Sequence, residues 1–222
     1  SFILYKPKDI VSGDFYWMAE KDGLSMFAAV DCTGHGVPGA FMSIVGHHQL
    51  NNVVNIIGAR NPSDVLNKLN LGVTNSLNQQ DKKNTVRDGM DLSLCTLDRN
   101  RKKLCFAGAN NPLYLVRNGE MQVIKGDKMP IGAYKDDEES SFQSHELEYQ
   151  DGDIIYLFSD GYADQFGGER NKKFMYKRFR ELILSISDKE MDEQREILDA
   201  EFESWRGEQE QIDDILVIGV RL

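Results

Sequence analysis

Aspartates placed where apolar runs begin or end are the residues of this sequence best suited to chemistry. The set is Asp14, Asp31, Asp88, Asp91, Asp160, Asp213 and Asp214. One Asp beside a Gly is ordinary turn chemistry, but Asp31 and Asp160 each close a separate apolar run, and the last two open a third. Carboxylates at the edge of a core are costly unless they are paired or bound to cations. Because no basic residue adjoins Asp31 or Asp160 in sequence, hard divalent cations with oxygen ligands are the expected partners.

A glycine-rich segment, GHGVPGA at residues 34–40, follows the first of these runs. Its glycines allow a sharp turn and a close approach of the backbone. A phosphate-binding P-loop is a rival interpretation, but the segment lacks the GxxxxGK(S/T) spacing and its lysine. We therefore interpret the segment as a sharp turn.

Short apolar runs rich in β-branched and aromatic residues predict strands. Three nearly continuous runs span residues 26–30, 154–158 and 215–220. Continuous runs indicate strands that are covered on both faces. Two hairpins are also predicted, joining residues 90–97 with 103–107 and 114–117 with 121–124. The second contains Asn118-Gly119, which is a strong signal for a tight hairpin turn.

Four segments have apolar residues at helical spacing and predict helices. They span residues 38–57, 62–78, 173–186 and 189–205. The second has a clear start, because Asn61 is a good N-cap and Pro62 suits the first helical position. Strands covered on both faces need a further layer on each side. The predicted fold is therefore α+β, a four-layer αββα sandwich of two mostly antiparallel β-sheets flanked by helices; a single sheet wrapped by helices stays an alternative.

Composition narrows the class of protein. The chain has 222 residues, with 26 basic and 36 acidic side chains and a formal net charge of −10. That length suits one domain over residues 1–222, and no basic stripe is present to bind nucleic acid. Three cysteines without a CxxC pair favour free thiols in a reducing cytoplasm. No run approaches the roughly 20 apolar residues of a membrane span, so we expect no direct membrane contact.

Six motifs make the sequence resemble a known superfamily. In chain order they are SGDFYW, VDCTGHGVPGAFMS, RDGMDLSLC, FAGANNPLYL, IIYLFSDGYAD and DDILVIGV. Together they resemble the PPM superfamily of type 2C protein phosphatases, and within it the bacterial SpoIIE/RsbU branch. The resemblance covers nearly the whole chain, from about Tyr5 to the last residue.

The resemblance implies the αββα sandwich and a cleft that holds two Mn²⁺ or Mg²⁺ ions. By matching motif, Asp31 resembles the carboxylate that bridges both ions, and the main-chain carbonyl of Cys32 resembles a backbone ligand. Asp160 and Asp213 resemble ligands of the second ion. Asp14 resembles a ligand of the same cluster, direct or through water.

Neighbouring aspartates leave two of these assignments open. Asp88 resembles the position that holds a third, weaker ion, with Asp91 as the less favoured neighbour. Asp213 and Asp214 stay alternatives for one ligand. The choice between Mn²⁺ and Mg²⁺ is open as well.

The chemistry implied by the resemblance is hydrolysis of phosphoserine or phosphothreonine on a partner protein. Two divalent ions about 3.5–4 Å apart activate a bridging hydroxide that attacks phosphorus, without a protein nucleophile. His35 is the candidate for protonating the leaving oxygen; ordering water and filling the turn are alternatives. Many eukaryotic relatives grip phosphate with an arginine, and this chain offers only Lys6 and Lys8 in the matching stretch.

The resemblance also implies partners. The expected substrate is a phosphorylated protein such as a STAS-type anti-sigma-factor antagonist, and the expected regulator is an upstream sensor domain in the same chain. We interpret the sequence as the C-terminal part of such a protein, in the cytoplasm or as the cytoplasmic portion of a membrane-anchored sensor. A monomer and a homodimer both stay open.

Two other functions are alternatives. A pseudophosphatase scaffold would keep the fold without turnover, but all the expected aspartates are present. A different two-metal phosphohydrolase, such as a nucleotide hydrolase or cyclase, would need a base-binding motif that the sequence lacks.

The two helices predicted over residues 38–57 and 62–78 follow Asp31 and Cys32 in the chain. They contain several glycines, including Gly46 and Gly72, which weaken helices. Similarity to the SpoIIE-like branch implies that this pair acts as a regulatory switch. A plain cover for the sheet is the alternative.

Overall fold

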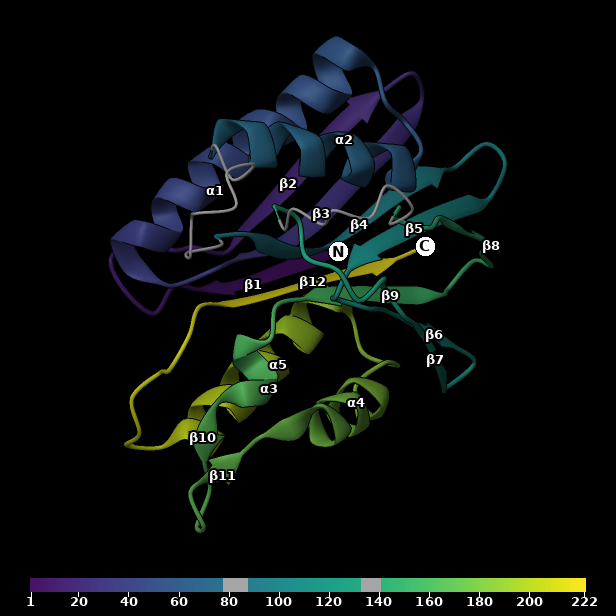
Figure 1. Ribbon diagram of the computed structural model, residues 1–222. Helices are drawn as coiled ribbons and strands as arrows, with labels where there is room; N and C mark the ends of the chain where they lie inside the picture. Colours follow the sequence, from purple (N-terminus) through teal and green to yellow (C-terminus); the bar gives the residue numbers. More distant parts are fainter. Residues whose placement is uncertain (78–87, 133–140) are drawn as a thin grey trace.

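Two five-stranded antiparallel sheets form the centre of the computed structural model, which describes residues 1–77, 88–132 and 141–222 (Figure 1). The first sheet contains, in spatial order, β1 (Phe2–Lys6), β12 (Ile215–Arg221), β9 (Ile154–Phe158), β6 (Leu113–Arg117) and β7 (Glu120–Ile124). The second contains β2 (Phe15–Lys21), β3 (Leu24–Cys32), β4 (Met90–Asp98), β5 (Lys103–Ala109) and β8 (His145–Glu148). Neighbouring strands in both sheets run antiparallel.

Helices cover the outer face of each sheet (Figure 1). The second sheet is covered by α1 (Gly36–Asn51), the π-helix η1 (Asn52–Ile57) and α2 (Pro62–Ser76). The first is covered by α3 (Gly161–Asp164), α4 (Met175–Ser185) and α5 (Met191–Arg206), beside the small ribbon of β10 (Phe166–Gly167) and β11 (Lys172–Lys173). The predicted αββα sandwich is therefore confirmed, and the single-sheet alternative is wrong.

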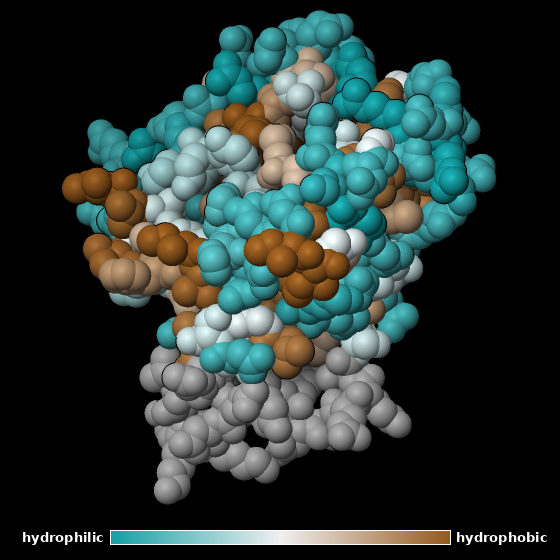
Figure 2. All heavy atoms as spheres, turned by 90° about the horizontal axis from the view of Figure 1, so that it is seen from above, coloured by the Kyte–Doolittle hydropathy of each residue, from teal (hydrophilic) through white to brown (hydrophobic). Residues whose placement is uncertain are grey.

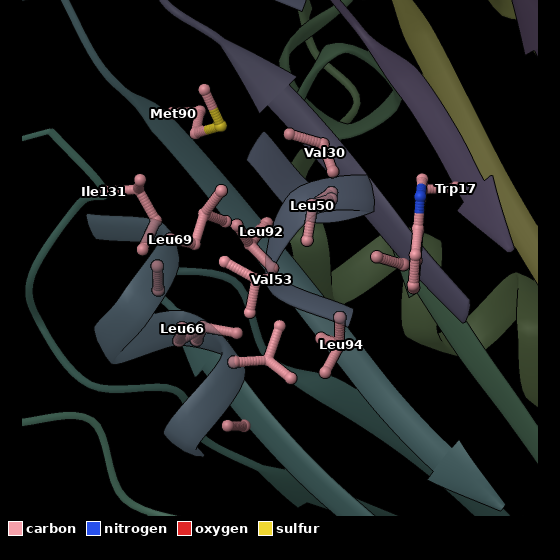
Figure 3. Packing of buried hydrophobic residues seen from close by; sticks show 14 of the residues in the cluster. Trp17, Val30, Leu50, Val53, Leu66, Leu69, Met90, Leu92, Leu94 and Ile131 are labelled. Carbon is pink, nitrogen blue, oxygen red and sulfur yellow. The ribbon is translucent and has the colours of Figure 1, made fainter. Parts of the chain in front are cut away.

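Three apolar layers hold the sandwich together. In β3, Phe27 and Ala29 face the layer between the two sheets, whereas Ala28 and Val30 face the helices. This alternation explains why the strand is a continuous apolar run. Under α1, η1 and α2, helix residues such as Leu66 pack onto β4 (Figure 3).

Several local predictions are confirmed. Asn61 caps α2 by accepting the backbone N–H of Ser63 at 3.0 Å. Asn118 and Gly119 both have positive φ, 51° and 78°, as a type I′ hairpin turn requires. The three cysteines are free.

Other predictions need correction. The helix expected over residues 38–57 changes to a π-helix at Asn52. The helices expected over residues 173–186 and 189–205 are α4 and α5, and each begins two residues later than expected, at Met175 and Met191. The edge strands β1, β2 and β8 were missed; β8 is polar, whereas β1 and β2 begin with short apolar runs that were not assigned to strands. The predicted end of α2 at Asn78 lies outside the described residues. Within the described ranges, no helix is long and apolar enough to cross a membrane.

Candidate active site

Antiparallel pairing gathers aspartates from several strands at one end of the sandwich. Asp31, near the end of β3, pairs with Asp91 at the start of β4. Asp14 lies just before β2, whose first residue pairs beside the end of β3. Asp160 follows the end of β9, and Asp213 precedes the start of its antiparallel neighbour β12. We call Asp14, Asp31, Asp160 and Asp213 the acidic group.

Two contacts join the loops that carry this group. The backbone N–H of Asp160, from the first sheet, points to Oδ2 of Asp31, from the second, at 3.4 Å. That distance is long for a hydrogen bond, but it places the two loops side by side. The buried hydroxyl of Ser159 accepts the backbone N–H of Leu216 at 3.0 Å, so the end of β9 is also tied to the start of β12.

Burial and mutual repulsion raise the pKa values of Asp14, Asp31 and Asp160. Burial is the main cause of the rise in the pKa of Asp14 to about 8, and the charges of neighbouring aspartates add to it. Burial also raises the pKa of Asp31 well above its ordinary value, helped by the charges of Asp14 and Asp160. The pKa of Asp160 rises to about 6 through burial and the charge of Asp213. These carboxyl groups therefore titrate as one coupled unit.

No protein cation forms an ion pair with the acidic group in the part of the chain that the structure describes. The ion pairs there involve other aspartates, such as Asp153 and Asp164, and none of these four. Asp14 is 3% exposed, and its Oδ2 has no hydrogen-bond partner. A buried polar atom without a partner is costly, so this oxygen indicates a missing donor or cation.

Asp213 and Asp214 have different surroundings although they are adjacent. Asp214 is 2% exposed, and its two carboxylate oxygens accept the backbone N–H groups of Lys8 and Gly13, each at 2.8 Å. Asp213 is only partly buried, and its Oδ1 accepts the backbone N–H of Asp214 at 2.9 Å. The burial of Asp214 suits a structural carboxylate, whereas Asp213 is the more open of the two.

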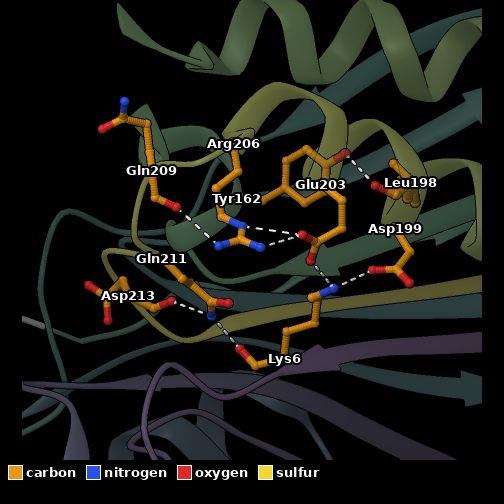
Figure 4. A network of polar contacts seen from close by, with 9 residues as sticks. All are labelled: Lys6, Tyr162, Leu198, Asp199, Glu203, Arg206, Gln209, Gln211 and Asp213. Carbon is orange, nitrogen blue, oxygen red and sulfur yellow. Dashed lines mark hydrogen bonds and ion pairs between the residues drawn. The ribbon is translucent and has the colours of Figure 1, made fainter. Parts of the chain in front are cut away.

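A polar network fixes the segment before Asp213 (Figure 4). The side-chain amide of Gln211 donates to the carbonyls of Lys6 and Asp213, both at 2.8 Å. The ammonium of Lys6 contacts the carboxylates of Asp199 and Glu203 on α5, each at 2.5 Å. Lys6 is thus engaged by α5, and of the two lysines in this stretch only Lys8 has its ammonium directed elsewhere.

His35, the N-cap residue of α1, contacts the loop before Asp14. Its Nδ1 lies 2.9 Å from Oδ2 of Asp9, and its Nε2 lies 3.0 Å from Nζ of Lys8. An ammonium only donates, so we assign the ring hydrogen to Nδ1, facing Asp9. In this arrangement the Lys8 ammonium donates the hydrogen of this contact, and Nε2 of His35 accepts it.

Cys32 follows Asp31 and is buried. Burial and the charges of nearby aspartates raise the pKa of its thiol well above the ordinary value. A neutral buried thiol is a poor nucleophile, which disfavours a covalent role for this side chain. Its carbonyl faces Gly13, where an added Cβ would lie 3.4 Å from the oxygen.

Asp88 and Asp91 lie on the segment that faces the turn after Cys32. The carbonyl of Gly89 accepts the backbone N–H of Thr33 at 2.9 Å and its hydroxyl at 3.0 Å, which places Asp88 next to this turn. Asp91 accepts the side-chain amide of Asn110 at 2.8 Å. Burial raises the pKa of Asp91, although this hydrogen bond opposes the rise.

The chemistry of the acidic group fits a hard divalent cation. Its donors are carboxylate oxygens, which Mg²⁺ and Mn²⁺ prefer, and Asp14 has an oxygen without a partner. Over residues 1–77, 88–132 and 141–222, no three His, Cys, Asp or Glu side chains are arranged to hold an ion as they stand. Mg²⁺ usually binds one or two carboxylates and keeps several waters, so the group fits such an ion by donor type.

A comparison with protein families identifies the family to which the chain belongs. The sequence model of the Stage II sporulation protein E (SpoIIE) family matches residues 21–222. The chain belongs to the SpoIIE family. A search of curated protein sequences finds no match.

Solved structures agree with this assignment. The SiaA-PP2C domain of Pseudomonas aeruginosa aligns with a TM-score of 0.90 and 33% identity, over 100% of this chain and 85% of that one. The PP2C phosphatase domain with a regulatory fragment of SpoIIE from Bacillus subtilis gives 0.75 and 19%, over 99% and 60%. RsbX in complex with magnesium gives 0.63 and 14%, over 98% and 92%. The last two show the fold alone, which is that of PP2C phosphatase domains.

In this SpoIIE-family domain, sequence reasoning named every member of the acidic group, but it missed two features around it. Asp14 lies outside the residues that the family model matches, yet inside the part that aligns with the SiaA domain. The hydrogen bond between Asp91 and Asn110 was missed. Asn110 has a positive φ of 58°, a conformation that Asn tolerates. The second missed feature is the role of Asp214 as an acceptor of two backbone N–H groups.

Proposed function

We propose that this domain hydrolyses phosphoserine and phosphothreonine in a partner protein and depends on Mn²⁺ or Mg²⁺. One observation carries the proposal: four carboxyl groups gather at one end of the sandwich without an ion-pair partner among the described residues, and Asp14 keeps a buried oxygen without a partner. Membership of the SpoIIE family and the alignment with the SiaA-PP2C domain support it. The magnesium in the RsbX structure supports the choice of metal.

The residues that would hold two ions are Asp14, Asp31, Asp160 and Asp213, with the carbonyl of Cys32. Asp88 is the proposed residue for a third ion, because it lies beside the same turn. When bound, such ions neutralise phosphate charge and activate the attacking water.

The protein side chains have distinct tasks in this proposal. Asp31 extends from the second sheet toward the loop of Asp160 on the first, so it suits a carboxylate shared between two ions. Cys32 contributes its main-chain carbonyl rather than its thiol, whose pKa is raised by burial. Lys8 and His35 contact each other at 3.0 Å on exposed loops, and we propose that this pair handles the leaving oxygen and its proton.

The surface beside the site suits a protein substrate. Seen from above, onto the layer of α1 and α2, hydrophobic side chains break a largely hydrophilic surface in several places (Figure 2). Ile10 is fully exposed and Val37 is 62% exposed. They lie next to Asp9 and Gly36, which are so close that a Cβ at Gly36 would lie 3.0 Å from Oδ2 of Asp9. Apolar contacts of this kind favour a phosphoprotein, which we propose is of the STAS class, over a nucleotide.

Assays on one preparation test the proposal. Purified domain should release phosphate from a phosphoserine protein with added Mn²⁺ or Mg²⁺, and release should stop after exhaustive chelation. Full activity without metal would contradict the proposal. Faster turnover of nucleotides would favour another two-metal phosphohydrolase, and binding of phosphoprotein without turnover would favour a pseudophosphatase scaffold.

Ile10→Ser tests the choice of substrate. The change should lower kcat/KM for the phosphoprotein and leave hydrolysis of p-nitrophenyl phosphate unchanged, because the small ester does not extend to the exposed Ile10 side chain. Equal losses on both substrates would contradict a substrate contact at Ile10.

A further inference from the structure

Asp214 is a buried carboxylate that binds backbone on both of its oxygens. Oδ1 accepts the N–H of Lys8 and Oδ2 accepts the N–H of Gly13, each at 2.8 Å. Hydrogen bonds from backbone N–H to a carboxylate are among the stronger ones in proteins. The carboxylate therefore ties both ends of loop 8–13, the segment that runs into Asp14.

The loop that Asp214 holds is packed tightly against the turn after Asp31. A Cβ on Gly13 would lie 2.5 Å from the carbonyl oxygen of Gly34, and a Cβ on Gly39 would lie 2.9 Å from Cα of Gly13. Just past the loop, the hydroxyl of Tyr5 donates to the carbonyl of Asp14 at 2.9 Å. Loss of the clamp would therefore let Asp14 and the turn shift relative to each other.

We infer that Asp214 is a positioning residue that fixes loop 8–13 and thereby places Asp14, in contrast to Asp213, which the proposed function assigns to the metal. The inference rests on the function proposed above. Both Asp214 oxygens accept a backbone N–H, and the residue is 2% exposed, so this carboxylate is directed at loop 8–13. The partly buried Asp213 carboxylate receives one N–H, from Asp214 itself, at 2.9 Å.

The matched variants Asp214→Asn and Asp213→Asn separate the two roles. In Asp214→Asn one acceptor oxygen becomes an N–H₂ group that faces a donor, so the clamp loses a hydrogen bond. Amide hydrogen exchange at Lys8 and Gly13, measured by NMR on metal-free protein, should become about tenfold faster or more. Asp213→Asn should leave exchange at both amides as in the unmodified chain.

Manganese binding supplies a second readout that does not depend on turnover. With free Mn²⁺ followed by electron paramagnetic resonance, Asp214→Asn should bind as many ions as the unmodified chain but with about tenfold weaker affinity. Asp213→Asn should lose affinity by a larger factor or bind one ion fewer. Loss of an ion in Asp214→Asn, or unchanged exchange and affinity in that variant, would overturn the inference.

A second pair keeps the test informative if Asp214→Asn does not fold. Lys8→Pro removes the N–H that Asp214 binds, whereas Lys8→Ala removes only the side chain. Only Lys8→Pro should speed exchange at Gly13, and equal exchange in both variants would overturn the clamp. If the unmodified chain bound no metal, the proposed function would fail, while the exchange data would still report on the clamp itself.

Discussion

The two ends of strand β9 carry aspartates in opposite electrostatic states. Asp153, just before the strand, is 2% exposed, and burial alone would raise its pKa. The guanidinium of Arg117, whose Nη2 lies 2.6 Å from Oδ2, and the N–H of Gln150 outweigh burial and hold that pKa below its ordinary value. Asp160, just after the strand, has no such partner among the described residues, and its pKa rises to about 6.

The difference shows how a fold separates structural charge from functional charge. Asp153 has its cation built in, so its charge stabilises the folded state. The acidic group has no built-in cation, so ionising its carboxyl groups weakens the metal-free fold until a cation arrives from solution. Changes at the two ends should therefore have opposite effects on stability.

The largest effect is expected from Asp31→Asn. Because this carboxylate is the one proposed to serve two ions, kcat at saturating Mn²⁺ should fall about 10²-fold or more. The metal-free variant should melt at a higher temperature than the unmodified chain, since a buried carboxyl with a raised pKa is removed. Near-normal turnover together with a lower melting temperature would contradict the role proposed for Asp31 in the acidic group.

Asp153→Asn should do the reverse. Removing the charge that Arg117 binds should cost about 2 kcal/mol of unfolding free energy, while kcat of the folded protein stays unchanged. Urea denaturation and activity on the same samples measure both quantities. A stabilised Asp153→Asn variant would mean that the two ends do not differ in the way described.

The stability of the metal-free domain should fall as pH rises. The raised pKa of Asp14, about 8 in the folded chain, exceeds its unfolded value of roughly 3.9. Its stabilising contribution is complete below that unfolded value and is lost as pH rises toward 8. Thermal melts from pH 5 to pH 9 should show a falling midpoint that flattens in Asp14→Asn, and a midpoint that rises over this range would contradict the assignment.

The smallest effect is expected from Gly72→Ala, which tests whether α1 and α2 regulate the site. An added Cβ would lie 2.6 Å from Oε1 of Gln49, so the two helices or the Gln49 side chain must move. We expect about a twofold change in the Mn²⁺ concentration needed for half activity, a shift of the modest size that such couplings have.

The double variant Gln49→Ala with Gly72→Ala is the control, because it restores the space and should return the metal dependence to normal. An unchanged metal dependence in Gly72→Ala would leave the helices as a plain cover for the sheet.

The sequence predicted the layers of the fold and the acidic group, but not the long-range contacts around that group. Continuous apolar runs reveal strands such as β9 because both faces are buried, and Asp160 is visible because it ends such a run. The neighbours of Asp214 are 201 and 206 positions away in the chain, and no local pattern reports contacts of that range. The change of helix type at Asn52 was also missed, because apolar spacing does not distinguish α from π geometry over one turn.

Proton release on metal binding tests the central claim most directly. If Asp14 and Asp31 are held neutral by burial and repulsion, a cation must displace their protons when it binds. Titration of Mn²⁺ into metal-free domain at pH 7, by calorimetry in two buffers of different ionisation enthalpy, should show release of roughly one to two protons per domain. Binding of Mn²⁺ with no proton release would contradict the account, because the acidic group would then already be ionised without its metal.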